Sequence, residues 1–413
     1  MHEVIVIGAG AAGYFAAIHA AAAGAEVLLL EKTRKTLAKV KISGGGRCNV
    51  THAAFQSGQL LKNYPRGERF LKKVITRFQV QDTVDWFTAR GVALKVEADG
   101  RMFPTSDSSQ SIIDCLRAEA DRCGVQLLTE GQVFQLVPKE AFWELQLQDK
   151  VLQARCVIVC TGGASKRSQL DWLANLNLDI VTPVPSLFTF NGPEEPLRQL
   201  PGVSVPQASV RLEGTKWSYV GPLLITHWGV SGPAVLKLSA FAARHLADTQ
   251  YEGVAQIRWV STCTEEQLQE LWRSQVAQHP KMQVKNSTAF PLPQRLWQFL
   301  LEQAEIPLQT PWQELNKKQK NKLTALCFAY PFRLSGKTTF KEEFVTAGGI
   351  ALAEVNPATM EARKHARLYF AGEVLDIDGI TGGFNFQAAW STGFVAGTQA
   401  GQAVAALKRP INE

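Results

Sequence analysis

The sequence predicts an α/β fold, a parallel sheet flanked by helices, into which a second, β-rich part of the chain is inserted. Residues 3–30 read as strand, helix and strand, which is the opening of a parallel sheet. From residue 182 that pattern stops, because six prolines fall within 25 residues and short strands follow. At 413 residues the chain exceeds one ordinary core, so two or three domains are expected.

Composition and cysteine usage predict a cytoplasmic protein without a membrane span. Hydrophobic residues make up 46% and charged residues 20%, as in globular proteins. No stretch reaches the roughly 18 uninterrupted apolar residues of a membrane helix, and the first residues lack a signal-peptide pattern. The seven cysteines are scattered without a C-x-x-C pair, which favours a reducing compartment. No metal-ligand spacing occurs, so no metal is expected; the oligomeric state is left open.

The net charge of +7 is moderately basic and favours an anionic partner of some kind. The densest basic run, residues 317–322, is interpreted as a solvated helix face. A phosphate-bearing cofactor is an anion as well, so the charge gives no specific reason for nucleic acid. Nucleic acid is therefore the less favoured partner, and a small-molecule substrate is expected.

A glycine motif lies between the first strand, residues 3–8, and the alanine-rich helix that follows. Gly8, Gly10 and Gly13 have G-x-G-x-x-G spacing. The first glycine permits the tight turn, the second admits a pyrophosphate to the backbone, and the third lets helix and strand pack closely. The free N–H groups at the start of the helix, including Ala11 and Ala12, then face the pyrophosphate.

Glu31 ends the second strand, residues 26–30, and lies 23 residues after Gly8. A carboxylate at this place accepts hydrogen bonds from ribose hydroxyls. It also repels a 2′-phosphate, so FAD or NAD fits better than NADP. Strand, glycines, helix, strand and acid in register make a dinucleotide site the strong prediction.

The remaining elements follow in order. Residues 68–90 read as two helices and 108–123 as a third that begins at a serine. Short alternating runs from 125 to 160 predict a β-meander followed by a return strand. Residues 264–329 read as amphipathic helices, and strand character resumes between 340 and 348. The core candidates of the helical stretch are Trp272, Leu296, Trp297, Phe299 and Leu300.

Three further segments favour FAD over NAD. Residues 43–49 (SGGGRCN) bring three glycines, which let the backbone approach a flat ring or a phosphate, next to the positive charge of Arg47; the alternative is a flexible loop. Residues 157–163 are an apolar strand that runs into Thr-Gly-Gly, where flavoproteins pass the pyrophosphate a second time. A strand ends at Gly372-Glu373, and a later helix begins at Gly382-Gly383. That helix start aims N–H groups at the flavin C2 carbonyl, where negative charge collects on reduction.

These residues resemble the glutathione-reductase-like flavoprotein superfamily, and more closely the BaiN/RdsA-type (YhiN-like) FAD-dependent oxidoreductases. The resemblance extends over nearly the whole chain in the same order. One departure is TLAK at residues 36–39, where a Pro-Gly-Arg-Lys type of turn is expected, although Lys39 is retained. The matching pieces are VIVIGAGAAG, KISGGGRCNVTH, GRMFPTSDSSQS, VIVCTGGAS, THWGVSGPAVLKLS, VTAGGI and LYFAGEVLDIDGITGGFNFQAAWSTG.

The resemblance implies a discontinuous Rossmann-like FAD-binding domain of glutathione-reductase type, residues 1–189 and 341–413. Residues 190–340 are expected to be an inserted substrate or lid domain, a small β-barrel with a helical subdomain at about 264–329. The FAD is expected to be noncovalent, because no histidine lies in the glycine loop. The expected FAD contacts are Gly8, Gly10, Ala11, Ala12, Gly13, Glu31, Lys32, Lys39, Ser43, Gly44, Gly45, Gly46, Arg47, Cys48, Val133, Thr161, Gly162, Gly163, Gly372, Glu373, Gly382, Gly383, Phe384 and Asn385.

The same resemblance implies reduction of an activated C=C or a related small organic substrate, with NAD(P)H as a transient electron donor. No second G-x-G-x-x-G provides a dedicated domain for that donor. Two alternatives are an RNA-modifying or RNA-binding flavoprotein and a non-catalytic flavin sensor. The expected catalytic candidates each have a structural alternative: Arg47 (phosphate charge), Cys48 (ring packing), Asn49 (turn cap) and His227 (packing near a Trp).

Overall fold

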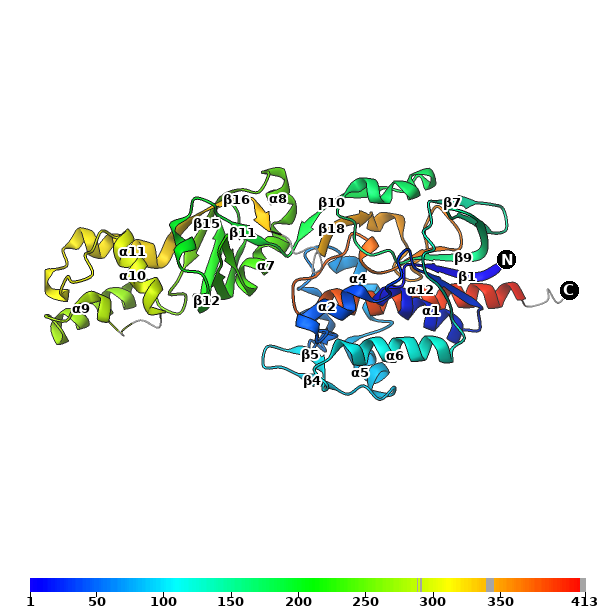
Figure 1. The fold of residues 1–413 in the computed structure, drawn as a ribbon, viewed down its shortest axis with the longest axis horizontal. Helices are drawn as coiled ribbons and strands as arrows, with labels where there is room; N and C mark the ends of the chain where they lie inside the picture. The colour runs from blue at the N-terminus through cyan, green and yellow to red at the C-terminus, as the bar shows by residue number, and fades with distance from the viewer. Residues whose placement is uncertain (288, 290–291, 339–344, 409–413) are drawn as a thin grey trace. The chain divides into compact units, whose positions relative to one another are not determined.

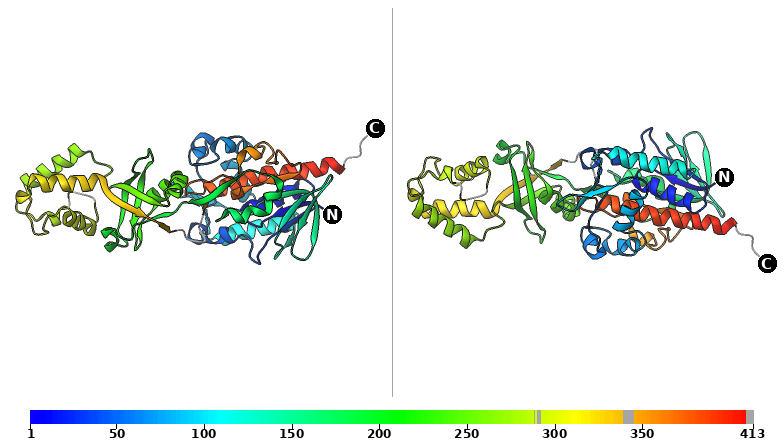
Figure 2. Two further views of the ribbon diagram at one scale, coloured as in Figure 1. Left: turned by 90° about the horizontal axis from the view of Figure 1, so that it is seen from above. Right: turned by 90° about the horizontal axis from the view of Figure 1, so that it is seen from below.

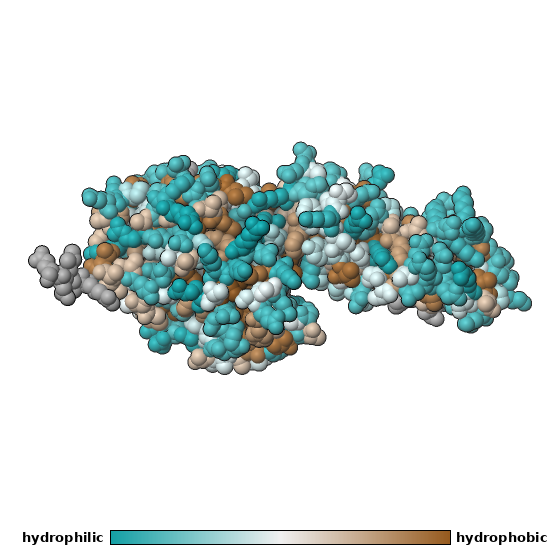
Figure 3. Space-filling view, turned by 180° about the vertical axis from the view of Figure 1, so that it is seen from behind, coloured by the Kyte–Doolittle hydropathy of each residue, from teal (hydrophilic) through white to brown (hydrophobic). Residues whose placement is uncertain are grey.

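The computed structural model describes residues 1–287, 289, 292–338 and 345–408. The chain forms two compact units. Unit 1 is Met1–Ser186 with Lys341–Glu413, and unit 2 is Leu187–Phe340. None of the helices within the described residues combines the length and the apolar character that a membrane crossing requires. On the face seen in the space-filling view, hydrophilic side chains predominate and apolar ones lie in small patches (Figure 3).

Unit 1 is built on a seven-stranded sheet with the order β6-β2-β1-β9-β8-β7, to which β19 is added beside β9. The apolar runs of β1, β2 and β9 are buried because helices cover the sheet, as expected for parallel strands. The parallel strands are β1 (His2–Ile7), β2 (Val27–Leu30), β6 (Gln126–Leu128), β9 (Val151–Val159) and β19 (Leu368–Phe370). The antiparallel strands are β7 (Gln135–Pro138) and β8 (Trp143–Gln146).

One part of the predicted meander is wrong. Strands β7, β8 and β9 form consecutive antiparallel pairs, as predicted. However, β6 lies at the opposite edge of the sheet, parallel to β2, with Leu29 opposite Leu127. The helix before β6 crosses over the sheet, so β6 pairs in parallel with a strand almost 100 residues earlier in the chain.

Two helices pack face to face beside the sheet, α1 (Ala11–Ala22) and α12 (Phe384–Lys408) (Figures 1 and 2). Their backbones approach closely because α12 presents glycines to α1. A Cβ added at Gly397 would lie 2.2 Å from the Ala16 carbonyl oxygen, and one at Gly393 would lie 2.8 Å from the Ala12 oxygen. The C-terminal segment is thereby fixed against the first helix of the chain.

The predicted helices over residues 68–123 are confirmed. Ser108 is the N-cap of α6, and its hydroxyl accepts the N–H of Gln110 at 3.3 Å. A small three-stranded sheet with the order β3-β5-β4 lies among these helices. The elements are α2 (Ala38–Gly46), β3 (Thr51–His52), α3 (Ser57–Leu61), α4 (Glu68–Ile75), α5 (Val80–Thr88), β4 (Leu94–Val96), β5 (Arg101–Pro104) and α6 (Ser109–Arg122).

The chain leaves and re-enters unit 1 along one two-stranded ribbon. Strand β10 (Ile180–Ser186) pairs antiparallel with β18 (Val345–Ile350), and Ser186 lies opposite Val345. The proline-rich stretch that was predicted to begin a boundary therefore begins inside a strand. Proline is tolerated there because β10 pairs with β18 on one side and with no other described strand.

Unit 2 contains a seven-stranded sheet whose two end strands meet in the chain. The order is β16-β15-β12-β13-β14-β11-β17, and Gly336 alone separates β16 from β17. The Gly336 N–H donates to the Tyr251 oxygen at 2.9 Å, and its carbonyl accepts the Asn191 N–H at 3.2 Å. The sheet is therefore closed on itself. The strands are β11 (Thr189–Asn191), β12 (Ser204–Leu212), β13 (Ser218–Ile225), β14 (Gly229–Ser231), β15 (Glu252–Arg258), β16 (Tyr330–Ser335) and β17 (Lys337–Thr338).

A helical part completes unit 2, as predicted for residues 264–329. The N-cap Thr264 opens α9 with a capping box, since its hydroxyl accepts the Gln267 N–H at 3.2 Å. All five predicted core residues, Trp272, Leu296, Trp297, Phe299 and Leu300, are buried. The helices of unit 2 are α7 (Pro233–Phe241), α8 (Ala243–Asp248), α9 (Glu265–Gln278), α10 (Gln294–Gln303) and α11 (Lys317–Ala329).

Candidate cofactor and active site

The three motif glycines have different surroundings at the β1–α1 turn. Gly8 has φ +105°, and a Cβ there would lie 2.5 Å from the Cys160 carbonyl oxygen. A Cβ at Gly13 would lie 1.7 Å from the Gly8 oxygen, which no side chain permits. A Cβ at Gly10 would meet nothing within 4 Å. The first and third glycines are therefore needed for packing, and the second leaves open space beside the backbone.

The N-terminus of α1 is open. Its N-cap, Gly10, makes no side-chain capping bond, and the N–H groups of Ala11 and Ala12 have no partner within the helix. Gly372 packs on this end, because a Cβ there would lie 2.7 Å from the Ala12 Cβ. Its N–H is held by the Thr392 hydroxyl at 2.9 Å. The helix end and the segment after β19 thus lie against each other.

Glu31 is fixed by the backbone at the end of β2. Its Oε2 accepts the Ala9 N–H at 3.1 Å, and its Oε1 accepts the Thr33 N–H and hydroxyl, both at 3.0 Å. The carboxylate therefore lies beside the glycine turn, as the ribose interpretation requires. Lys32 next to it is exposed, and Val133, in the segment after β6, is buried.

The Thr-Gly-Gly segment after β9 passes next to the first glycine turn. Thr161 is exposed, and its Cα would lie 3.0 Å from a Cβ at Gly8. Gly162 has φ +75° and open space around it. A Cβ at Gly163 would lie 2.5 Å from the Thr346 hydroxyl and 2.7 Å from Glu373 Oε1. This second passage therefore joins the β1 and β18 segments.

Glu373 connects three parts of the chain. Its Oε2 lies 2.7 Å from Lys39 Nζ, and its Oε1 accepts the Thr346 N–H at 2.9 Å. Lys39 and Glu373 are 334 residues apart in sequence. TLAK replaces the expected Pro-Gly-Arg-Lys type of turn at residues 36–39, yet Lys39 still reaches Glu373.

The glycine loop over residues 43–46 is tightly folded rather than extended. Ser43, Gly44 and Gly45 interrupt α2 with non-helical angles, and Gly44, Gly45 and Gly46 have φ between +57° and +85°. A Cβ at Gly44 would lie 2.9 Å from Phe103, whereas Cβ atoms at Gly45 and Gly46 would meet nothing within 4 Å. The last two glycines therefore leave the backbone accessible.

The Gly382–Gly383 turn before α12 is held by Asn49. With the amide oriented as its neighbours require, Asn49 Oδ1 accepts the Gly383 N–H at 3.0 Å and Nδ2 donates to the Thr51 oxygen at 2.9 Å. A Cβ at Gly383 would lie 2.5 Å from the Thr51 carbonyl. Asn49 thus connects the glycine loop to the start of α12, and its amide is used in doing so.

Phe384 and Asn385 brace the same turn. Asn385 accepts the Gly379 N–H at 2.8 Å and donates to the Gly379 oxygen at 2.9 Å. The His52 ring stacks on Phe384 at 4.7 Å between centroids, and its Nδ1 lies 3.1 Å from the Gly382 oxygen. Sequence reasoning missed His52, although it ends the KISGGGRCNVTH piece; that position was its only signal.

A buried ion pair between Arg66 and Asp378 lies directly before this turn. No motif or spacing in the sequence predicts this pairing. Arg66 binds Asp378 through both carboxylate oxygens, and the Ser186 hydroxyl donates to Asp378 Oδ2 at 2.7 Å. Burial raises the pKa of the Asp378 carboxyl above its usual value, opposed by Arg66 and Ser186. The end of β10 is thereby tied to the segment that leads into α12.

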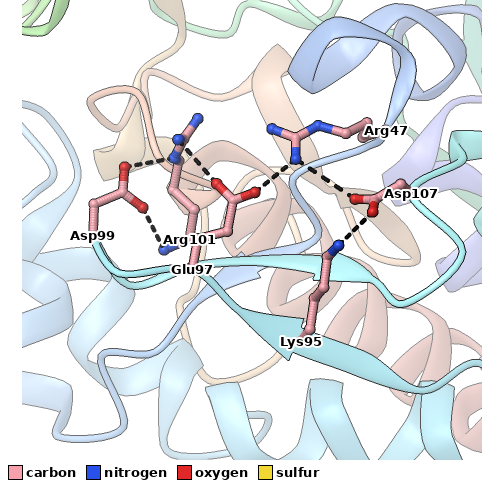
Figure 4. Close-up of polar contacts among 6 residues, drawn as sticks. All are labelled: Arg47, Lys95, Glu97, Asp99, Arg101 and Asp107. Carbon is pink, nitrogen blue, oxygen red and sulfur yellow. Dashed lines mark hydrogen bonds and ion pairs between the residues drawn. The ribbon is translucent and has the colours of Figure 1, made fainter.

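Arg47 is engaged by the protein itself. Its Nη1 lies 2.6 Å from Glu97 Oε1 and 3.5 Å from Asp107 Oδ1, and its guanidinium lies 4.0 Å over the Phe103 ring. The charge expected to face a phosphate is therefore shared with two carboxylates of the β4–β5 region. Figure 4 shows the whole network, which also includes Lys95, Asp99 and Arg101.

Cys48 is fully buried in a left-handed backbone conformation, φ +61°. Burial raises the pKa of its thiol to about 12, so the thiol stays protonated at neutral pH. The structure thus brings Arg47, Cys48 and Asn49 together in unit 1. It places His227 in unit 2, exposed between β13 and β14, with its carbonyl accepting Arg198 Nε at 2.7 Å.

The assembled features fit a dinucleotide cofactor. Two helix N-termini, of α1 and α12, are preceded by glycine turns, and the open sides of Gly10 and Gly162 face space that a Cβ would enter without contact. Glu31 supplies a fixed carboxylate for a ribose. Among the described residues, no three His, Cys, Asp or Glu side chains are placed to hold a metal ion.

Similar proteins are found among protein families, curated proteins and solved structures. A family model described as HI0933-like protein Rossmann domain matches residues 2–399. The Escherichia coli protein named ribosomal RNA dihydrouridine synthase is 32% identical over 399 residues, 94% of this chain and 96% of its own. The Clostridium scindens 3-dehydro-bile acid delta(4,6)-reductase is 29% identical over 415 residues, 97% and 100% of the two chains. A solved 3-ketosteroid-delta4-(5alpha)-dehydrogenase from Rhodococcus jostii covers 97% of this chain and 96% of its own, with 14% identity and TM-score 0.47.

Proposed function

The chain belongs to the HI0933-like Rossmann family of FAD-binding flavoprotein oxidoreductases, and we propose that it reduces an activated carbon–carbon double bond with electrons from NAD(P)H. The observation that carries the proposal is the joint placement, in unit 1, of the open α1 end, Glu31 and the Gly382–Gly383 turn. These features support a cofactor bound along its whole length, with one end at α1 and the other at α12.

FAD supplies hydride transfer when bound, and the protein supplies binding, orientation and protons. Glu31 and the N–H groups of α1 would hold the ribose and the pyrophosphate. Asn49 and His52 hold the turn before α12. We propose His52 as a positioning residue for this turn. Cys48 fits a packing role, because a buried thiol with a pKa of about 12 does not donate a proton readily at neutral pH.

Two relatives' names describe the same kind of change. Dihydrouridine is uridine with its C5=C6 bond saturated, and a delta(4,6)-reductase saturates ring double bonds next to a ketone. In both substrates the double bond is conjugated to a carbonyl, so hydride addition at the far carbon is favourable. This shared chemistry supports reduction of a conjugated C=C and leaves two substrate classes, a small unsaturated ketone and a uridine in RNA.

The RNA alternative is favoured by the 32% identity to the ribosomal RNA dihydrouridine synthase over 94% of this chain. Unit 2 also carries 16 Lys and Arg against 11 Asp and Glu, hence +5 of the total +7. A net positive charge attracts a polyanionic substrate over a distance, without a direct phosphate contact at each lysine. We therefore place a uridine in RNA beside the small unsaturated ketone as a second candidate substrate.

Anaerobic stopped-flow absorbance near 450 nm, after mixing with NADH or NADPH separately, tests the electron donor. Rapid bleaching by one of them is expected. The reduced protein is then mixed with a uridine-containing ribosomal RNA fragment or with a steroid enone, and reoxidation is followed. Failure of both nicotinamides to bleach the flavin would remove the NAD(P)H-linked proposal, and the acceptor that reoxidises the flavin identifies the substrate class.

A further inference from the structure

Positive charge in unit 1 is concentrated on one short segment. Residues 62–77 contain six Lys and Arg and a single acid, a net charge of +5. Unit 1 as a whole carries 28 Lys and Arg against 26 Asp and Glu, a net charge of +2. The rest of the unit is therefore net negative, by −3. A surface suited to solubility alone has charges of both signs interspersed.

Five of these basic side chains form an exposed group that we name the α4 basic face. Helix α4 buries Phe70, Leu71, Val74 and Ile75 and turns its polar side outward. None of the ion pairs found in the described ranges involves the five, and all five are exposed. Arg69, Lys72 and Lys73 share one side of the helix, since residues three and four apart are neighbours. The α4 basic face consists of Lys62, Arg69, Lys72, Lys73 and Arg77.

The segment that carries this face is fastened to the turn before α12. Tyr64 donates its hydroxyl to the Phe384 oxygen at 2.7 Å, and the Asn63 oxygen accepts the Ile380 N–H at 2.9 Å. Arg66 forms the buried ion pair with Asp378. These contacts lie within unit 1, so the face has a fixed position relative to Gly382–Gly383, and α4 and α12 also contact each other directly.

Unit 2 contains a second run of basic residues, 317–322, which lies on helix α11. Lys317, Lys318 and Lys320 lie in the first turns of α11, and Lys322 pairs with Glu305 at 2.7 Å. This run belongs to unit 2, whereas the α12 turn belongs to unit 1. Lys317, Lys318 and Lys320 carry the same charge as Arg69, Lys72 and Lys73, and both sets lie on a helix.

We propose that the α4 basic face binds the phosphodiester backbone of an RNA whose target uridine enters the site at the Gly382–Gly383 turn; this rests on the RNA form of the proposed function. A base that reacts inside a structured RNA has to leave its stack, and phosphate contacts on both sides fix its register. Lysine and arginine side chains without protein partners are suited to those contacts, because they give up no ion pair on binding.

The test is fluorescence anisotropy with a fluorescein-labelled, uridine-rich single-stranded RNA of about 20 nucleotides, titrated at several salt concentrations. The variant is Arg69→Ala with Lys72→Ala and Lys73→Ala. The matched control is Lys317→Ala with Lys318→Ala and Lys320→Ala, which removes the same charge. Flavin content and melting temperature establish that each variant is folded. Alanine keeps helix propensity in both helices.

In the α4 variant, the slope of log affinity against log salt is expected to become shallower by about 2, since each lost contact to a single strand removes about 0.7. The control is expected to keep the wild-type slope. Equal losses in both variants, an unchanged slope in the α4 variant, or no RNA binding by the wild type at low salt would each overturn the proposal. Flavin bleaching of the wild type by NAD(P)H is measured separately, so that a failed reductase assay with an α4-dependent slope refutes the reductase and leaves the RNA surface standing.

Discussion

Nη1 of Arg47 lies 2.6 Å from Oε1 of Glu97, with the guanidinium stacked on Phe103. The two side chains come from positions 50 residues apart and are both partly exposed. The pairing turns an arginine of the glycine loop into a clamp between that loop and the β4–β5 region. The main role of Arg47 is therefore to hold the loop. A substitution of Arg47 is expected to lower the stability of the protein first.

We expect Arg47→Ala and Glu97→Gln to destabilise the protein by similar amounts and to be non-additive. The expected coupling in a double-mutant cycle is about 0.5–1 kcal/mol, because the pair is partly solvent-exposed. Urea unfolding of the wild type, both single variants and the double variant measures it. Strictly additive losses of stability would show that the two side chains act independently. A much larger loss of activity in Arg47→Ala than in Glu97→Gln would indicate a direct catalytic role for Arg47.

The glycine turn allows packing and cofactor binding to be separated. Gly13→Ala should prevent stable folding, since its Cβ would lie 1.7 Å from the Gly8 oxygen. Gly10→Ala should leave the fold intact and weaken FAD binding by at least about tenfold, or ~1.4 kcal/mol, because its Cβ enters open space beside the α1 end. Melting temperature and FAD titration of the apoprotein measure the two effects. Normal FAD affinity in Gly10→Ala would remove the pyrophosphate assignment.

Glu31→Ala should weaken FAD retention while the protein stays folded. A charged hydrogen bond to a ribose contributes about 1.5–3 kcal/mol, which is roughly tenfold or more in affinity. Glu31→Gln is the control, because one amide oxygen still accepts a hydrogen bond from Thr33 or Ala9. The ratio of absorbance at 450 and 280 nm after gel filtration reports retained flavin. If Glu31→Ala retains as much flavin as the wild type, the carboxylate does not bind the ribose.

Stability should fall in alkaline solution because of buried thiols. Burial raises the pKa of Cys48 from 9.0 to about 12. Above pH 9 the unfolded chain loses this proton while the folded protein keeps it, so the free energy of unfolding decreases as pH rises towards 12. Between about pH 8.5 and pH 10, Cys48 alone should account for a loss of about 1 kcal/mol. Urea unfolding of wild type and Cys48→Ala at both pH values measures it; an equal pH dependence in the two proteins would contradict the buried, protonated thiol.

The insertion should be removable. Ser186 and Val345 lie opposite each other in the β10–β18 ribbon, so a two-residue Asn-Gly turn can join them. The shortened chain is expected to fold and bind FAD but to lack turnover, because the resemblance implies that the inserted residues form a substrate or lid domain. Flavin content and NAD(P)H-dependent turnover are the two measurements. Turnover that survives the deletion would show that unit 1 alone carries the reaction.

Local patterns in the sequence predicted local structure well. The G-x-G-x-x-G turn, α6 with its Ser108 cap and the helical core around Trp272 are determined by neighbouring residues, and all three were predicted. The pairing of β6 with β2 was not, because parallel strands depend on where a crossover returns to the sheet. Alternating polarity looks the same in either arrangement.

Within the candidate site, the glycine turns were predicted from the sequence, because glycine motifs mark them. The partners of Arg47, at Glu97 and Asp107, are distant in sequence and carry no motif. The Tyr64 and Arg66 contacts to residues 378–384 were missed for the same reason, since an ion pair between remote segments leaves no periodic trace. Sequence therefore indicated where glycine turns occur, whereas the side chains that hold those turns became apparent only in the fold.

The closure of the unit 2 sheet at Gly336 has a consequence for association between molecules. Open sheet edges present rows of unpaired main-chain groups that recruit further strands and lead to aggregation. Here the two end strands meet at Gly336, and Glu195 accepts the Arg333 N–H at 2.7 Å along the outer side of β16. The described strands thus leave little edge for another chain to extend. Side chains on the surface of unit 2 can therefore change without opening a strand edge to which another chain could add.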